Sequence, residues 1–208
     1  MTEQVRPSLI VKVGGSLLDW PELSERLPGF LQGLGDPAKR TLLLAGGGAT
    51  VDLIRALDPI HHFGEERSHH LAIQALDLTA LILSNILGNS RVIFDESEFA
   101  ACWDAGTYPI LAPSRLLGGD LNLEGDALPE SWEVTSDSIA AWLAARLRVE
   151  RLVLLKSANV PHETSRSLAA RLGLVDPYFP RIASGLKWVE SRNLRDPDGS
   201  LIALSRSE

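Results

Sequence analysis

Hydrophobic residues in this chain form short runs that alternate with longer amphipathic stretches. Most of the runs are rich in Leu, Ile and Val, which is typical of strands buried on both faces of a parallel sheet. The predicted strands are residues 8–13, 41–45, 91–94, 110–112, 151–155 and 200–204. Because stretches with helical spacing follow most of these runs, the pattern predicts an α/β fold with a central, mostly parallel sheet.

Two helices are predicted from apolar residues that recur every three or four positions. The longer one covers residues 68–87, and Gly88 is well placed to end it. Its expected apolar face is Leu71, Ala75, Leu78, Ile82 and Ile86. The second covers residues 136–147, with Thr135 or Ser136 as its N-cap. Its expected apolar face is Ile139, Trp142, Leu143 and Leu147.

Length and composition are those of one globular domain, residues 1–208. Hydrophobic residues make up 45% and charged residues 23%, which excludes a disordered chain and a charged coiled coil. Residues 113–129 are richer in Pro and Gly, and they predict a long ordered loop or a small hairpin rather than a domain linker.

Charge and cysteine content narrow the possible partners and location. A net charge of −7 argues against nucleic acid or anionic lipid as partners. The longest apolar stretch, residues 78–87, is shorter than a membrane span. The opening MTEQVRPS lacks the layout of a signal peptide, and the single Cys102 excludes an internal disulfide. We therefore expect a cytoplasmic protein without nucleic-acid or membrane partners.

The first candidate site is the turn after the first predicted strand. Lys12 stands near the end of that strand, and Gly14, Gly15 and Ser16 follow it. Glycines let backbone N–H groups approach an anion closely, and a lysine adds a positive charge, so this turn is a candidate phosphate site. A tight strand-to-helix turn with a chance lysine is the alternative.

A second glycine-rich turn follows the next predicted strand. Gly46, Gly47 and Gly48 stand there in a row and precede a predicted helix. Three glycines lower the stability of a folded backbone, which suggests that a ligand lies against them, although a purely structural turn remains possible. Because both turns follow parallel strands, we expect them to meet at the carboxyl edge of the sheet, where α/β folds bind ligands.

A third feature combines an acidic and a basic residue. Asp137 stands at the start of the second predicted helix, and Lys156 stands at the end of the strand that follows it. Asp137 could be an ordinary first-turn carboxylate, which the helix dipole favours. Alternatively, it orients nearby lysines at a reactive centre.

These segments together resemble a known family. In chain order they are VKVGGS, AGGGATVD, WEVTSDSIAAWLA and LLKSANV. They are similar to the amino acid kinase family over most of the chain. The stretches TSDSIA, HLAIQALD and VDPYF are most similar to a small branch that includes an archaeal kinase of (5-(aminomethyl)furan-3-yl)methyl phosphate in methanofuran biosynthesis. The resemblance implies an open αβα sandwich, with the phosphoryl acceptor in the N-terminal half and ATP in the C-terminal half.

The resemblance also implies roles for individual residues. Lys12 would bind the transferring phosphoryl group, and Asp137 would keep the catalytic lysines in place. Lys156 or Lys187 would neutralise the phosphate on the leaving side. The β- and γ-phosphates of ATP would be bound by Gly14, Gly15 and Ser16, and the acceptor by Gly46, Gly47 and Gly48. Mg²⁺ would be held by phosphate oxygens and water, so no protein metal ligand is named. A homo-oligomer is expected from the family.

Two histidine pairs flank a short acidic segment. His61, His62, His69 and His70 could in principle bind Zn²⁺ or Ni²⁺, but their spacing fits no closed structural site. A solvated loop is the simpler interpretation. The resemblance suggests a third one, in which His70 binds a polar group of the acceptor and Arg67 assists as an anion-binding residue.

Three functions from two classes follow from these observations. The first is an ATP-dependent kinase that converts a phosphate monoester to a diphosphate by in-line transfer. The second is a kinase of a small carboxylate or amino acid, since Arg55, Arg67 and His70 could neutralise either anion. The third is a nucleotide-binding or storage protein of the same fold without turnover.

Overall fold

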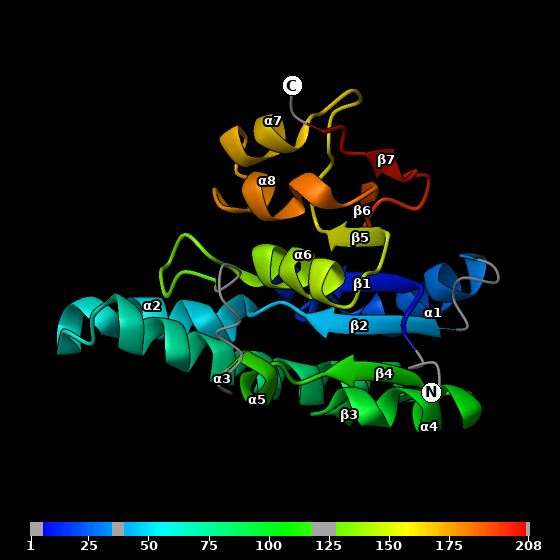
Figure 1. The fold of residues 1–208 in the computed structure, drawn as a ribbon, viewed down its shortest axis with the longest axis horizontal. Helices are drawn as coiled ribbons and strands as arrows, with labels where there is room; N and C mark the ends of the chain where they lie inside the picture. Colours follow the sequence, from blue (N-terminus) through cyan, green and yellow to red (C-terminus); the bar gives the residue numbers. More distant parts are fainter. Residues whose placement is uncertain (1–5, 35–39, 118–127, 207–208) are drawn as a thin grey trace.

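The computed structural model describes residues 6–34, 40–117 and 128–206 (Figure 1). Its strands form a seven-stranded sheet in the order β3-β4-β2-β1-β5-β6-β7. They are β1 (Leu9–Val13), β2 (Thr41–Ala45), β3 (Ser90–Ile93), β4 (Tyr108–Leu111), β5 (Arg151–Lys156), β6 (Trp188–Asn193) and β7 (Ile202–Ala203). All neighbouring pairs are parallel except β6 and β7, which are antiparallel. The expected α/β architecture is confirmed.

Helices cover both faces of the sheet. They are α1 (Leu23–Gly33), α2 (Gly48–His61), α3 (Glu65–Leu87), α4 (Phe99–Asp104), α5 (Ser114–Leu117), α6 (Ser136–Arg146), α7 (Arg166–Arg171) and α8 (Phe179–Ile182). Short 3-10 turns lie at η1 (Gly15–Leu17), η3 (Glu96–Glu98) and η4 (Ala183–Gly185). Helices α1 and α3 pack on one face, and α4, α6 and α8 pack on the other.

Alternation along the central strands distributes side chains between these two layers. In β1, Leu9, Val11 and Val13 pack against α1 and α3. Ile10 points to the opposite face, where α6 lies. Lys12 follows Ile10 by two positions, so its side chain shares that face. This alternation directs a lysine toward the first turn of α6.

Two strand predictions at the C-terminal end differ from the structure. β6 was not among the predicted strands, and its sequence WVESRN has no continuous apolar run. Only Val189 and Ser191 are buried in it. The predicted strand at residues 200–204 is shortened to Ile202–Ala203. The loop or hairpin expected at residues 113–129 contains α5, and residues 118–127 lie outside the described residues.

The predicted face of α3 is wrong for three of its five residues, whereas Ala75 is buried and Ile86 packs partly buried against the core. Leu71, Leu78 and Ile82 are 38%, 50% and 38% exposed. Its inward side chains are Ile73, Ala75, Leu76, Thr79, Ala80, Leu83 and Leu87. The helix has apolar residues on more than one side, so periodicity alone could not select the side that packs on the sheet.

Length and composition would also allow α3 to cross a membrane, with 33% of its most apolar window buried. A core helix passes the same test, so this is weak evidence.

Candidate active site

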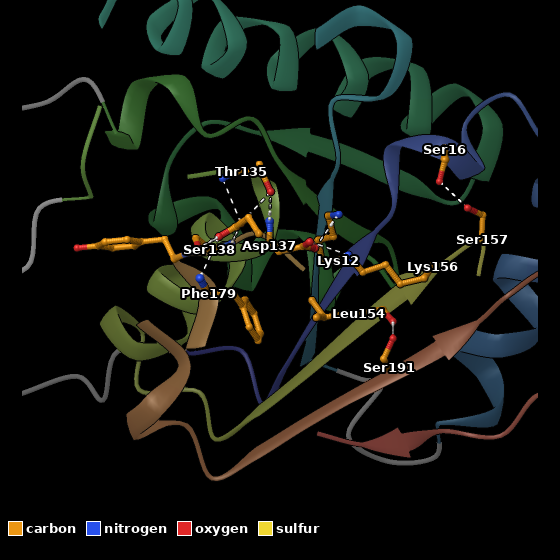
Figure 2. A network of polar contacts seen from close by, with 12 residues as sticks. Lys12, Ser16, Thr135, Asp137, Ser138, Leu154, Lys156, Ser157, Phe179 and Ser191 are labelled. Atoms are coloured by element: carbon orange, nitrogen blue, oxygen red, sulfur yellow. Dashed lines mark hydrogen bonds and ion pairs between the residues drawn. The ribbon is translucent and has the colours of Figure 1, made fainter. Parts of the chain in front are cut away.

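Three charged side chains meet above the carboxyl edge of the sheet. Lys12 comes from β1, Lys156 from the end of β5, and Asp137 from the first turn of α6 (Figure 2). Lys12 Nζ lies 2.9 Å from Asp137 Oδ1, and Lys156 Nζ lies 2.6 Å from Asp137 Oδ2. The side chains of Lys12, Asp137 and Lys156 are 5%, 7% and 14% exposed. One carboxylate therefore holds two nearly buried ammonium groups.

This environment shifts the pKa values of Asp137 and Lys156. Burial alone would raise the pKa of Asp137, but the charges and hydrogen bonds of Lys12 and Lys156 lower it from 3.8 to about 2. Burial is also the largest cause acting on Lys156 and lowers its pKa, although Asp137 opposes that effect. Two basic groups share one carboxylate here, an arrangement that favours an anion beside them.

The two glycine-rich turns lie against each other at this edge. Gly14 N–H donates to the Leu155 carbonyl at 2.8 Å, which places the first turn beside β5. A Cβ on Gly15 would lie 2.1 Å from the Gly48 nitrogen, and one on Gly46 would lie 2.6 Å from the Gly15 nitrogen. Gly48 also has a φ of +52°. Glycine is therefore required by the close approach of the two backbones.

Both turns leave backbone N–H groups available. The N-cap of α2 is Gly47, which has no capping side chain, and the first turn of α2 has no acidic residue. η1 begins after Gly14, which also lacks a side-chain cap. By contrast, Thr135 caps α6. Since uncapped helix starts favour anions, the turns are suited to phosphate or carboxylate groups.

A cavity of about 380 Å³ opens beside these groups. Asp137 and Lys156 line it, whereas Lys12, Gly14 and Gly46 do not. The turns and β5 contribute Gly15, Ser16, Gly47, Gly48 and Lys156. Helices α2 and α3 contribute Val51, Asp52, Arg55, His69, Ala72, Ile73 and Leu76. The remaining walls are Trp132, Val134, Thr135, Ser136, Asp137, Ile139 and the segment 173–177. Ser16 Oγ also lies 2.8 Å from Ser157 Oγ, which links η1 to the end of β5 (Figure 2).

The acceptor-side residues differ from those expected. Arg67 and His70 do not line the cavity, whereas His69 does, and it is 6% exposed. Burial lowers the pKa of His69, against opposing effects of the Ser131 backbone and Glu130. Consecutive residues on a helix point about 100° apart, so the His69-His70 pair gave no signal as to which one faces inward.

Arg55 and Trp132 form the cationic and aromatic part of the wall. The Arg55 guanidinium lies 5.2 Å from the centre of the Trp132 ring and pairs with Asp52 at 3.0 Å. Trp132 Nε1 donates to Asp58 Oδ2 at 3.1 Å, which fixes the ring. Arg55 was one of three anion-binding candidates, but no local sequence signal marked Trp132.

The assignment of Lys187 to the phosphates is contradicted. Lys187 precedes β6, and the neighbouring Trp188 pairs with Arg151 at the amino end of β5. The Lys187 Nζ lies 3.3 Å from Glu150 Oε2. Because the strands are parallel, this position is at the edge opposite the cavity. Lys156 is therefore the late lysine at the site.

Some exposed groups could hold a metal ion near the start of α3. Ligand atoms of Glu66, His70 and Glu130 all lie within 4.8 Å of one another. His70 Nε2 lies 3.5 Å from Glu130 Oε1, so the contact between these two side chains already explains part of this arrangement. All three residues are exposed, and none lines the cavity.

Comparison with known proteins places this geometry in a family. The amino acid kinase family model matches residues 7–160. The [5-(aminomethyl)furan-3-yl]methyl phosphate kinase of Methanocaldococcus jannaschii is 27% identical over 146 residues, or 70% of this chain and 63% of that protein. The match thus spans less than two thirds of the relative's length.

Solved structures show the same fold. Uridylate kinase from Archaeoglobus fulgidus has a TM-score of 0.61 at 14% identity, covering 96% of this chain and 91% of that one. Aspartate kinase from Synechocystis has a TM-score of 0.59 at 15% identity, covering 96% of this chain and 40% of that one. Since the family model matches most of the chain, this protein belongs to the amino acid kinase family.

Proposed function

We propose that the chain is an ATP-dependent kinase of a small molecule and transfers the phosphoryl group in line at the Lys12–Asp137–Lys156 cluster. The observation that carries this proposal is the position of two buried ammonium groups on one carboxylate, beside a cavity bordered by two uncapped glycine turns. Family membership supports the phosphotransferase class.

Charge stabilisation is the main contribution of the cluster to catalysis. Lys12 would neutralise the transferring group, and Lys156 would neutralise the phosphate on the leaving side. With a pKa of about 2, Asp137 stays ionised at neutral pH and is a poor proton acceptor. Its role is therefore to orient the two ammonium groups. No covalent enzyme intermediate is required.

The residues present fit a nucleoside triphosphate and Mg²⁺. Gly15 and Ser16 would offer donors to the β- and γ-phosphates, whereas the Gly14 N–H, expected to do the same, already donates to the Leu155 carbonyl. The carboxylates that line the cavity are Asp52, Asp137 and Asp176, and each already accepts from side chains or backbone groups. Mg²⁺ would therefore be held mainly by phosphate oxygens and water, and when bound it would supply additional charge neutralisation.

We propose a phosphate monoester as the acceptor and a diphosphate as the product. The acceptor would lie against Gly47 and Gly48, which line the cavity, with Arg55 and His69 near its anionic group. Apolar walls from Val51, Ile73 and Leu76 would contact its organic part. The name of the Methanocaldococcus jannaschii relative supports a phosphate ester of this kind.

The test is a panel of acceptors incubated with MgATP and analysed by ³¹P nuclear magnetic resonance. Coupled resonances of a new diphosphate ester are expected with small aromatic or aliphatic phosphate monoesters. Transfer to carboxylates alone would replace the proposed acceptor class. ATP binding without transfer to any acceptor would favour a storage protein and overturn the kinase proposal.

Two predictions about the whole protein are tested separately. We expect a homo-oligomer, which light scattering in solution measures. We expect a cytoplasmic location, which fractionation of the source cells tests.

A further inference from the structure

Asp176 is buried beside the reactive cluster, in the loop between α7 and α8, and is 6% exposed. Its Oδ2 accepts from Thr135 N at 3.1 Å, Thr135 Oγ1 at 2.8 Å and Ser138 N at 3.0 Å. Its Oδ1 accepts from Ser138 Oγ at 2.5 Å, Tyr178 N at 3.1 Å and Phe179 N at 2.9 Å. One carboxylate thus joins the start of α6 to the start of α8.

These six contacts fill the acceptor positions of a buried carboxyl group. All six donors are uncharged N–H or O–H groups, and hydrogen bonds to an ionised acceptor are stronger than neutral ones. The N-terminal dipole of α6 favours the same negative charge. Losing the carboxylate would leave several buried donors without an acceptor, which costs more than losing ordinary surface contacts.

The contacts of Asp176 bracket the catalytic carboxylate in sequence. Thr135 and Ser138 lie on either side of Asp137, and Figure 2 shows the three together, to the left of Lys12 and Lys156. Thr135 Oγ1 also accepts from Asp137 N at 3.4 Å. The backbone that carries Asp137 is thus fixed on both sides by one residue.

Asp176 also belongs to the cavity wall formed by residues 173–177. Burial is the largest cause acting on the pKa of Lys156 and lowers it. The nearby carboxylate of Asp176 acts in the opposite direction and raises that pKa.

We propose that Asp176 is a positioning residue of the phosphoryl-transfer site: it fixes the first turn of α6, so that Asp137 reaches Lys12 and Lys156 at once. This inference rests on the proposed kinase function. It assigns a role to a residue that touches neither lysine and that contacts Asp137 only through the flanking residues Thr135 and Ser138.

The test begins with Asp176→Asn, which keeps the size of the side chain but places an NH₂ group where three donors converge. A shift of the α6 start by a fraction of an ångström to one ångström should lower kcat by about 10- to 100-fold. KM for ATP should change much less. The double variant Asp137→Asn/Asp176→Asn should be no slower than Asp137→Asn alone, because Asp176 acts through Asp137.

Asp77→Asn is the matched control. Asp77 lies in α3 and accepts from the backbone and hydroxyl of Ser114 at the start of α5, so it also joins two helices. It does not line the cavity. We expect Asp77→Asn to lose stability and to keep kcat, whereas a purely structural role of Asp176 would give the same result in both variants.

A second readout does not depend on activity. Hydrogen exchange in Asp176→Asn should accelerate at the amides of residues 135–139 and 178–179 more than elsewhere. Should Asp176→Asn fail to fold, Ser138→Ala removes one donor and should show a smaller kcat loss with the same local exchange.

Three results would overturn the positioning role. They are kcat in Asp176→Asn within threefold of the wild type, multiplicative losses in the double variant, and unchanged exchange at residues 135–139. If the wild type transfers no phosphoryl group to any acceptor, the kinase proposal fails, and the exchange data alone then decide whether Asp176 fixes the start of α6.

Discussion

Replacing Asp137 by Asn tests how the charged cluster contributes to stability. The substitution keeps the side-chain size and leaves Lys12 and Lys156 without their shared carboxylate. The pKa of Asp137 is lowered from 3.8 to about 2, and each pKa unit corresponds to about 1.4 kcal/mol, so the charge contributes about 2 kcal/mol at pH 7. Breaking a buried ion pair can lower the free energy of unfolding by up to about 5 kcal/mol. In Asp137→Asn the decrease is smaller, because Lys156 can lose its proton and then no longer buries an unpaired charge.

The stabilisation by Asp137 depends on pH. A carboxylate with a lowered pKa in the folded state stabilises the protein above its unfolded pKa, and this stabilisation is lost as the pH falls. We expect Asp137→Asn to be less stable than the wild type by about 2 kcal/mol at pH 7. The difference should shrink between pH 4 and pH 2, where Asp137 gains its proton.

Urea denaturation followed by tryptophan fluorescence measures the difference in unfolding free energy at pH 7 and at lower pH, since the chain has five tryptophans. The double variant Asp137→Asn/Lys156→Met removes one cation as well and should recover part of the loss. A difference below about 0.5 kcal/mol at pH 7 would refute the reasoning, because surface substitutions have effects of that size. An equal difference at pH 7 and pH 3 would refute it too.

Three further predictions concern the turns, the pH profile and the acceptor wall. Gly15→Ala places a Cβ 2.1 Å from the Gly48 nitrogen and should lower the free energy of unfolding in urea by about 2 kcal/mol or more. In the control Gly29→Ala the new Cβ meets nothing within 4 Å, so the free energy of unfolding should rise by about 0.5–1 kcal/mol. Burial lowers the pKa of Lys156 against the opposing effect of Asp137, so a pH–rate profile should fall on the alkaline side below pH 10.5, and Lys156→Arg should remove that limb. Trp132→Phe loses the hydrogen bond to Asp58 and should raise KM for the acceptor about fivefold with kcat nearly unchanged in steady-state kinetics; an unchanged KM would exclude Trp132 from the acceptor wall.

The central strands and part of the charged cluster were predictable from the sequence for a physical reason. β1, β2 and β5 are buried on both faces, so their apolar runs are continuous. Ligand groups of a parallel sheet gather at its carboxyl edge, which predicts that the two glycine-rich turns meet there. The late lysine came from the family resemblance, which left Lys156 and Lys187 as alternatives. Asp137 followed from the position of its helix start and from the family resemblance.

Other features depend on tertiary packing that local patterns do not contain. β6 is bordered by the short β7 and has polar residues at several positions, so it lacks an apolar run. α3 has more than one apolar side, and only contact with the sheet selects the buried one. Lys187 was one of two candidates for the late lysine, but the parallel register of β5 and β6 places it at the amino edge of the sheet.

Asp176 shows the same limit at the site itself. Its six donors come from segments about 40 residues apart in the chain and from its own loop, as in the contact between Thr135 and Asp176 with a separation of 41. The short sequence VDPYF gave a family resemblance but no indication of this contact.

The most direct test of the proposed mechanism is single-turnover transfer from γ-labelled ATP by the wild type and by Lys12→Ala, each at saturating MgATP and acceptor. Lys12 is 4% exposed and lies 2.9 Å from Asp137, so the variant removes one of the two ammonium groups of the cluster. The mechanism predicts a rate lower by about 10² to 10³, the loss seen when one charge-stabilising group is removed. A folded Lys12→Ala protein that transfers at the wild-type rate would contradict it.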